Sequence, residues 1–147
     1  MKKYPENHKI PPITIGFLKS YEDFKNLFIS SELTVPYDSS LNMLIVYSIS
    51  SDLTRITCYP VKAQEIWKLK IIYNTGSKDA LKNTTKYLLD YKLIHTTGIS
   101  EKKGKFSVEY YILPHKDWKD GITLTDVISE NYDVLQCGIE LLSKKQN

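Results

Sequence analysis

Apolar and polar residues follow two different periods along this chain, and each period predicts a different kind of element. Residues 13–18 alternate like a short strand, and Ser20 follows as a helix N-cap three residues before Asp23. Apolar side chains then recur at helical spacing over residues 21–28. Residues 41–49 fit a strand and a buried helix equally well, because short apolar runs carry no decisive period.

The segment between Pro60 and Gly76 supports two interpretations. Proline suits the first turn of a helix and glycine the position after its end, so these two residues predict a helix. Three apolar residues share one face of that helix: Ile66, Leu69 and Ile72. In a strand, by contrast, four apolar residues would alternate with lysines: Trp67, Leu69, Ile71 and Tyr73. The flanking residues favour the helix, and the strand remains the alternative.

Local signals are clearer in the second half of the chain. Ser77 predicts the start of a helix that runs to about Tyr91, followed by an apolar pair at residues 93–94. A basic turn containing Gly104 separates two alternating segments and predicts a β-hairpin. Thr123 then caps a predicted amphipathic helix over residues 125–142.

Composition and cysteine usage narrow the class of protein. The 147 residues are 41% hydrophobic and 25% charged, which is ordinary for one globular domain. Cys58 and Cys137 lie far apart without metal-ligand spacing, which predicts reduced thiols in the cytoplasm. The N-terminus lacks the apolar core of a signal peptide, and no apolar run is long enough to cross a membrane. The sequence therefore predicts a cytoplasmic protein that does not contact membranes.

Positive charge is concentrated in one part of the chain. The net charge of the whole protein is +3, but residues 62–118 hold eleven lysines against six acidic residues. The residues before this segment carry equal numbers of positive and negative charges, and those after it carry a net charge of −2. A local excess of lysine of this kind is typical of a surface that meets nucleic acid.

This basic segment contains an ordered set of elements: SKDALKNTTKYLLDYKLIHTTGISEKKGKFSVEYYIL. The order of capped helix, apolar pair, strand, basic turn and aromatic strand resembles the recognition helix and wing of winged helix-turn-helix transcriptional regulators of the PadR, MarR and ArsR types. The resemblance covers residues 40–113. Two departures are Lys92, where a glycine is frequent, and the length of the segment over residues 60–76.

The resemblance implies a fold class and a division of the chain. The expected class is α+β, with a winged helix-turn-helix over residues 39–116. Residues 1–38 would form an N-terminal arm with a short strand and helix. Residues 117–147 would form a connector and a C-terminal amphipathic helix that pairs with its copy in a homodimer.

The implied function is sequence-specific binding of double-stranded DNA by a transcriptional regulator. Three lysines four residues apart share one exposed helix stripe, and the short polar residues beside them can reach base edges. Amides at the helix start and lysines at the hairpin tip suit phosphate contacts. The residues expected to contact DNA are Ser77, Lys78, Lys82, Asn83, Thr85, Lys86, Lys102, Lys103 and Lys105.

Two other functions remain open. A winged helix can serve as a protein-interaction subunit of a larger assembly. If residues 66–73 form a strand, the element order becomes strand, helix, strand, strand, helix, strand. That order resembles ferredoxin-like ACT domains, which implies a ligand-binding regulatory domain.

Enzyme chemistry finds no support in the motifs of the sequence. The three histidines are scattered, and no phosphate-binding glycine loop or nucleophile motif is present. Asp117, Asp120 and Asp126 match no metal-binding loop. The sequence therefore predicts a binding protein without catalytic residues, metal or cofactor.

Overall fold

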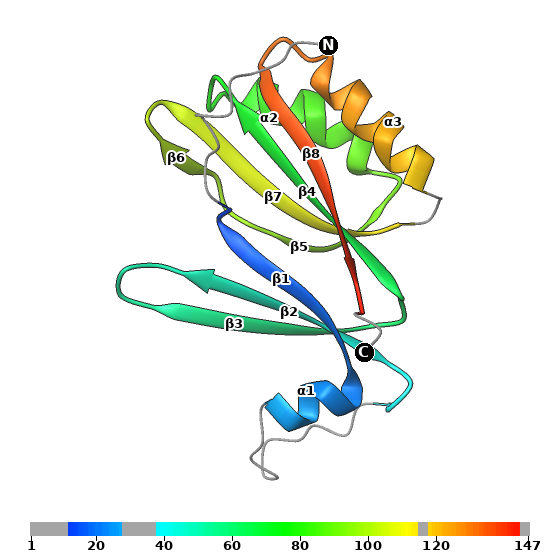
Figure 1. The fold of residues 1–147 in the computed structure, drawn as a ribbon. Helices are drawn as coiled ribbons and strands as arrows, with labels where there is room; N and C mark the ends of the chain where they lie inside the picture. The colour runs from blue at the N-terminus through cyan, green and yellow to red at the C-terminus, as the bar shows by residue number, and fades with distance from the viewer. Residues whose placement is uncertain (1–11, 28–37, 115–117, 145–147) are drawn as a thin grey trace.

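The structure, a computed structural model, describes residues 12–27, 38–114 and 118–144 (Figure 1). These residues form eight strands and three α-helices arranged in two antiparallel sheets. The predicted winged helix-turn-helix is therefore wrong, and so is the resemblance to PadR, MarR and ArsR regulators. The part of residues 40–76 that should supply the helices before a recognition helix forms three strands instead.

The small sheet comes first along the chain and has the order β1-β2-β3. Its strands are β1 (Thr14–Ser20), β2 (Asn42–Ile49) and β3 (Thr54–Val61). The short helix α1 (Tyr21–Leu27) begins directly after β1. The predicted cap at Ser20 is confirmed, because its Oγ accepts a hydrogen bond from the Asp23 amide at 3.1 Å.

The large sheet has the order β5-β7-β4-β8, with β6 paired to β7. Along the chain, the strands of this sheet and the helices between them are β4 (Glu65–Tyr73), α2 (Lys78–Thr85), β5 (Lys92–Thr96), β6 (Ser100–Lys102), β7 (Lys105–Leu113), α3 (Trp118–Ser129) and β8 (Val134–Ser143). Apart from the short β6, this is the strand, helix, strand, strand, helix, strand order of a ferredoxin-like arrangement. The strand interpretation of residues 66–73 is therefore correct, and the preferred helix is wrong.

The residues that suggested a helix over 60–76 have other roles. Pro60 lies in β3, an edge strand of its sheet, where a missing N–H is tolerated. Gly76 lies against the ring of Phe106, so that an added Cβ would come within 2.9 Å of a ring carbon. Neither residue therefore marks the end of a helix.

The predicted C-terminal helix over residues 125–142 is also wrong. The helix of this region, α3, ends at Ser129, and β8 follows a turn in which Asn131 Oδ1 accepts a hydrogen bond from the Asp133 amide. In β8, Cys137 and Ile139 pack toward one core, whereas Leu142 packs toward another. Apolar residues on both sides of a strand produced the false helical spacing.

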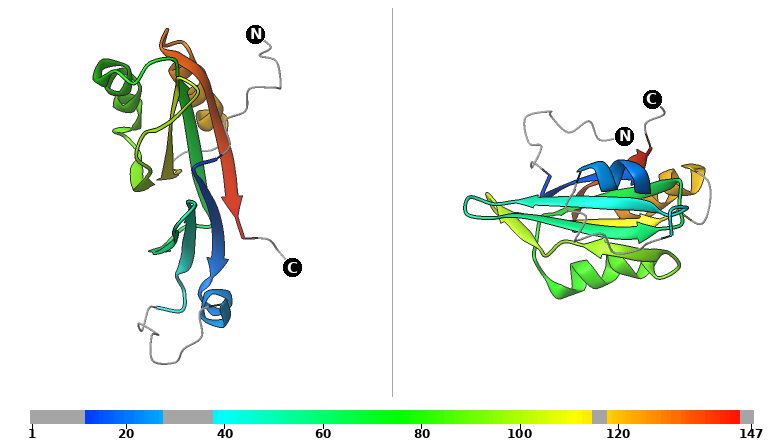
Figure 2. Two further views of the ribbon diagram at one scale, coloured as in Figure 1. Left: turned by 90° about the vertical axis from the view of Figure 1, so that its left-hand side faces the viewer. Right: turned by 90° about the horizontal axis from the view of Figure 1, so that it is seen from below.

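Two helices cover one face of the large sheet, and the small sheet contacts only part of the other (Figures 1 and 2). The first core joins α2 and α3 to β4 through Trp67, Leu69, Ile71 and Tyr73. We call the opposite face the open face. The small sheet packs on one end of the open face, where β4 begins and β8 ends. This contact contains a second core, whose buried residues are Leu18, Leu44, Val46, Val61, Ile66, Tyr111 and Leu142. The rest of the open face is left uncovered by the small sheet.

The helices are short. Within the described ranges, none combines the length with the apolar composition that crossing a bilayer requires.

Candidate functional site

The helix residues predicted to bind DNA lie on or beside α2. Ser77 caps this helix as predicted, because its Oγ accepts a hydrogen bond from the Ala80 amide at 3.1 Å. The side chains of Lys78, Lys82, Asn83 and Lys86 are exposed. Thr85 is half-buried, and its hydroxyl donates to the Leu81 carbonyl oxygen at 2.8 Å, which turns that group back to its own helix.

The hairpin lysines lie on a different element. The predicted hairpin is confirmed: Lys102 pairs with Lys105, and the two turn residues Lys103 and Gly104 have φ values of 51° and 71°. Lys102 and Lys103 are exposed, whereas Lys105 is half-buried. The described residues thus offer lysines on a helix and on a hairpin, and their role in DNA binding stays a prediction.

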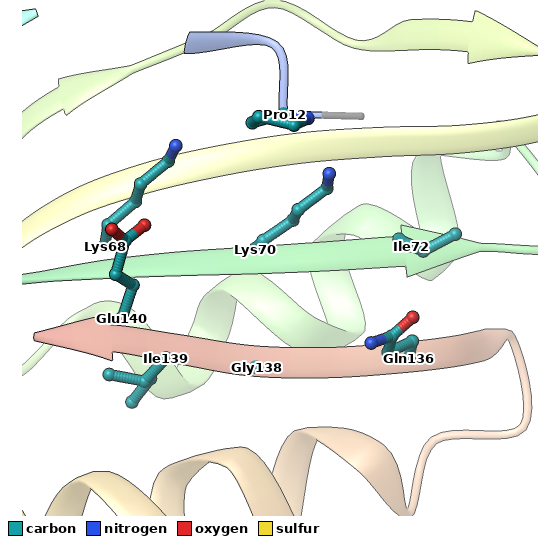
Figure 3. A pocket seen from close by; sticks show the side chains of 8 residues that line it. All are labelled: Pro12, Lys68, Lys70, Ile72, Gln136, Gly138, Ile139 and Glu140. Atoms are coloured by element: carbon teal, nitrogen blue, oxygen red, sulfur yellow. The ribbon is translucent and has the colours of Figure 1, made fainter. Parts of the chain in front are cut away.

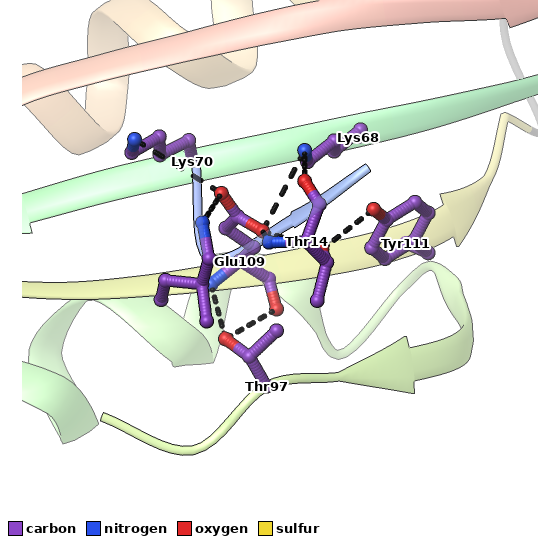
Figure 4. Close-up of polar contacts among 7 residues, drawn as sticks. Thr14, Lys68, Lys70, Thr97, Glu109 and Tyr111 are labelled. Carbon is purple, nitrogen blue, oxygen red and sulfur yellow. Dashed lines mark hydrogen bonds and ion pairs between the residues drawn. The ribbon is translucent and has the colours of Figure 1, made fainter. Parts of the chain in front are cut away.

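A buried polar cluster, which we call the Glu109 cluster, joins β1 to the open face (Figure 4). Glu109 of β7 has no exposed surface. Its carboxylate accepts hydrogen bonds from the amides of Ile13 and Thr14, each at 2.9 Å, and from Thr14 Oγ1 at 2.5 Å. Lys68 Nζ lies 3.6 Å from Glu109 Oε2 and also donates to the Thr14 carbonyl oxygen. A carboxylate with these partners fixes the start of β1 on the sheet.

The Glu109 cluster also fixes which face of β1 is buried. Thr14 Oγ1 lies 2.7 Å from the Tyr111 hydroxyl, so Thr14 points inward. Gly16, two residues later, faces the buried Tyr111 ring so closely that an added methyl group would overlap it. Because side chains alternate along a strand, Ile15 and Phe17 must point outward.

The outward side chains form an apolar face on the small sheet. In the strand register Ile15 of β1 lies beside Tyr47 of β2, which lies beside Ile56 of β3. The Phe17 and Tyr47 rings meet edge to face with 5.8 Å between centroids. Apart from the half-buried Tyr47, the side chains of this face are between 43 and 63% exposed. We use the term apolar face for Ile15, Phe17, Tyr47, Ile49 and Ile56.

A pocket of about 470 Å³ lies on the uncovered part of the open face (Figure 3). The strands β4 and β8 supply most of its lining: Lys68, Lys70, Ile72, Gln136, Gly138 and Glu140. Pro12 borders it on the side toward which the two lysines extend. Gly138 leaves open space, because a Cβ added there would meet no atom within 4 Å. The pocket therefore exists because the central residue of this part of β8 has no side chain.

A histidine connects the two sheets at another point. Tyr59 of β3 and His95 of β5 share a hydrogen bond of 2.6 Å between Oη and Nδ1. The His95 ring also packs edge-on against Tyr111, at 5.7 Å between centroids. Burial lowers the pKa of His95, although the Glu109 carboxylate acts in the opposite direction. Neutral imidazole is therefore the form that fits this contact.

Metal-binding geometry is not found in the described part of the chain, where no three His, Cys, Asp or Glu side chains gather in one place. The comparisons with known proteins add no assignment. No family model matches the chain, and no curated protein is detectably similar to it.

Sequence reasoning missed Glu109, Lys68 and Thr14. A signal was present: two lysines in β4 and one glutamate in β7 interrupt otherwise apolar strands, and opposite charges in buried strands imply that they pair. Thr14 gave no signal, since a threonine in an edge strand is ordinary.

We predict that Glu109→Gln lowers the free energy of unfolding by about 3–5 kcal/mol, because it leaves the buried Lys68 ammonium without its carboxylate. Urea denaturation measures the decrease. The double variant Glu109→Gln with Lys68→Met removes both charges and should recover part of it. A Glu109→Gln variant as stable as the parent protein would contradict the role given to this cluster.

The lowered pKa of His95 predicts a loss of stability in acid. The unfolded chain takes up a proton near the ordinary histidine pKa of 6.5, before the folded protein does. Stability should therefore begin to fall as the pH drops through about 6.5 and stop falling below the folded pKa. The measurement is urea denaturation between about pH 5 and pH 8 for the parent and for His95→Gln. The variant should show a shallower decline, and equal declines would rule out His95 as a cause.

Proposed function

We propose that this protein is a partner-binding module, not an enzyme, and that its apolar face docks on an apolar protein surface. The observation that carries the proposal is the orientation of β1. A strand with one solvated face normally buries its large apolar side chains. This strand buries Leu18 in that way, but its other two inward positions are Thr14 and Gly16, and it exposes the larger Ile15 and Phe17. Exposed apolar side chains gathered on one face are typical of interaction surfaces.

The chemistry of the face indicates the kind of partner. Its five members carry no charge, so it offers nothing to the phosphates of nucleic acid. The aromatic pair of Phe17 and Tyr47 can supply the buried anchors that dominate many protein interfaces. The homodimer expected from the sequence pairs through a C-terminal helix, which the structure replaces with β8. A second copy docked on the apolar face is a different homodimer and one form of this proposal.

Binding of double-stranded DNA is a second proposal, supported by exposed lysines on α2 and on the β6–β7 hairpin. Without a winged helix these lysines favour phosphate contacts over the reading of bases. A cytoplasmic location belongs to the proposal as well, and it is supported by two cysteines that are both free thiols.

We predict that a photo-reactive phenylalanine analogue at position 17 or 49 of the full chain forms a protein adduct in the native host. The same analogue in place of Tyr132, which is 92% exposed on another part of the surface, is the control. Mass spectrometry identifies the adduct, and an adduct of two copies would define a homodimer. Equal labelling at all three positions, or none at 17 and 49, would eliminate the apolar face as a docking surface.

If DNA is bound, its affinity should fall as salt rises, because lysine–phosphate contacts release counterions. Replacing Lys102, Lys103 and Lys105 with Gln should flatten that dependence by up to about one unit for each phosphate that is no longer neutralised. Fluorescence anisotropy with a labelled duplex measures both effects. Absence of binding at low salt would remove this second proposal.

A further inference from the structure

The two edge strands of the large sheet differ in how well they are protected from other strands. At one edge, β5 is five residues long, begins with Lys92 and has an irregular register around residues 93–95. At the other edge, β8 is ten residues long, contains no lysine, arginine or proline, and has Glu140 as its single charge (Figure 1). Proteins usually block exposed edges with short strands, charges, prolines or bulges. The strand β8 has little of this protection.

The outer edge of β8 is regular over most of its length. Among the described strands, only β4 is hydrogen-bonded to β8. The single register shift between these two strands lies near the start of β8, so residues 136–143 form an uninterrupted run. Such a run offers a row of backbone N–H and C=O groups to a further strand.

Gly138 lies in the middle of this run. A Cβ added there would meet no described atom within 4 Å, whereas a Cβ at Gly16 would overlap the Tyr111 ring. Packing inside the described chain therefore does not call for glycine at position 138. Glycine weakens a strand, and within one it often marks a site where another backbone approaches closely.

The residues on the two sides of Gly138 complement each other. If a second β8 runs antiparallel with the two Gly138 residues opposite each other, Gln136 of each copy lies opposite Glu140 of the other. Both side chains are exposed and lie on the open face (Figure 3), so the Gln136 amide can donate to the Glu140 carboxylate. On the other face Cys137 lies opposite Ile139, and both of these side chains pack toward the first core.

We propose that β8 pairs antiparallel with β8 of a second copy, with the two-fold axis at Gly138. A shift of the pairing by one or two residues would place Glu140 opposite Leu135, Val134, Cys137 or Gly138, none of which offers a comparable donor. In the proposed register the two large sheets form one continuous sheet. The helices of both copies then lie on one side of it and the small sheets on the other. This surface is separate from the apolar face, so the proposal does not depend on the proposed function.

The first test compares charge variants of the full chain by sedimentation equilibrium. Gln136→Glu places two carboxylates opposite each other at two symmetry-related positions and should weaken the dimer by about tenfold. The exchange variant, Gln136→Glu with Glu140→Gln, restores one donor and one acceptor at each position and should recover most of the affinity. Thr96→Glu adds the same charge to an exposed position of β5, the other edge strand, and should leave the affinity unchanged.

The second test determines the register with cysteine variants in a background of Cys58→Ser and Cys137→Ser. Gly138→Cys should form a disulfide-linked dimer on mild oxidation, because opposite Cα atoms in antiparallel strands lie about 4.5–5.5 Å apart. Gln136→Cys should not, since its two copies would be separated by four residues, or about 13 Å along the strands.

Circular dichroism and thermal unfolding establish that each variant folds. A parent protein that sediments as a monomer at about 1 mM would overturn the proposal. So would an exchange variant that recovers no affinity, or equal cross-linking of Gly138→Cys and Gln136→Cys. If Phe17→Ser dissociates the dimer and Gln136→Glu does not, the second copy binds the apolar face and the pairing through β8 is wrong.

Discussion

A carboxylate with no access to water must find its partners inside the protein, and Glu109 finds most of them at the start of β1. Two backbone amides and one hydroxyl from residues 13 and 14 donate to it, and Lys68 balances its charge. Displacing β1 would take three hydrogen bonds away from a buried charge, so this position of β1 on the large sheet is strongly favoured. That position places Gly16 against Tyr111, and it brings β2 and β3, which are hydrogen-bonded to β1 in turn, over the same end of the sheet.

The same constraint accounts for the apolar face and for the pocket on the open face. Because Thr14 must point inward, the alternation of the strand directs Ile15 and Phe17 to the outside. Because the small sheet is held at one end of the open face, the pocket over Gly138 stays uncovered by it. Lys68 then belongs to the cluster that holds the sheets together, whereas Lys70 stands between that cluster and the pocket.

Some short-range signals in the sequence predicted local structure correctly, whereas Pro60, Gly76 and Thr123 do not mark the helix ends expected of them. The caps at Ser20 and Ser77 and the turn at Gly104 depend on contacts within a few residues, and all three are confirmed. The spacing of apolar residues gave wrong predictions for β4 and β8. Both strands are apolar on two faces, so their apolar residues also fall at helical spacing. Because residues 66–73 were predicted as a helix and not as a strand, a winged helix was favoured over the ferredoxin-like arrangement. The candidate sites were out of reach for a different reason: Thr14 and Glu109 are 95 residues apart in the chain, and no local pattern links them.

That separation has a consequence for how the protein is made. A ribosome that adds about 5–20 residues per second needs about 5–20 seconds to reach residue 109 after residue 14. During this time β1 can pair with β2, but its hydrogen-bond acceptor in β7 does not yet exist. The contact between Thr14 and Glu109 also closes a long loop. The entropy lost on closing this loop is offset only once the large sheet has formed. The strand β1 is therefore among the last of the described strands to reach its final place, and until then the nascent chain exposes apolar residues on both sides of that strand.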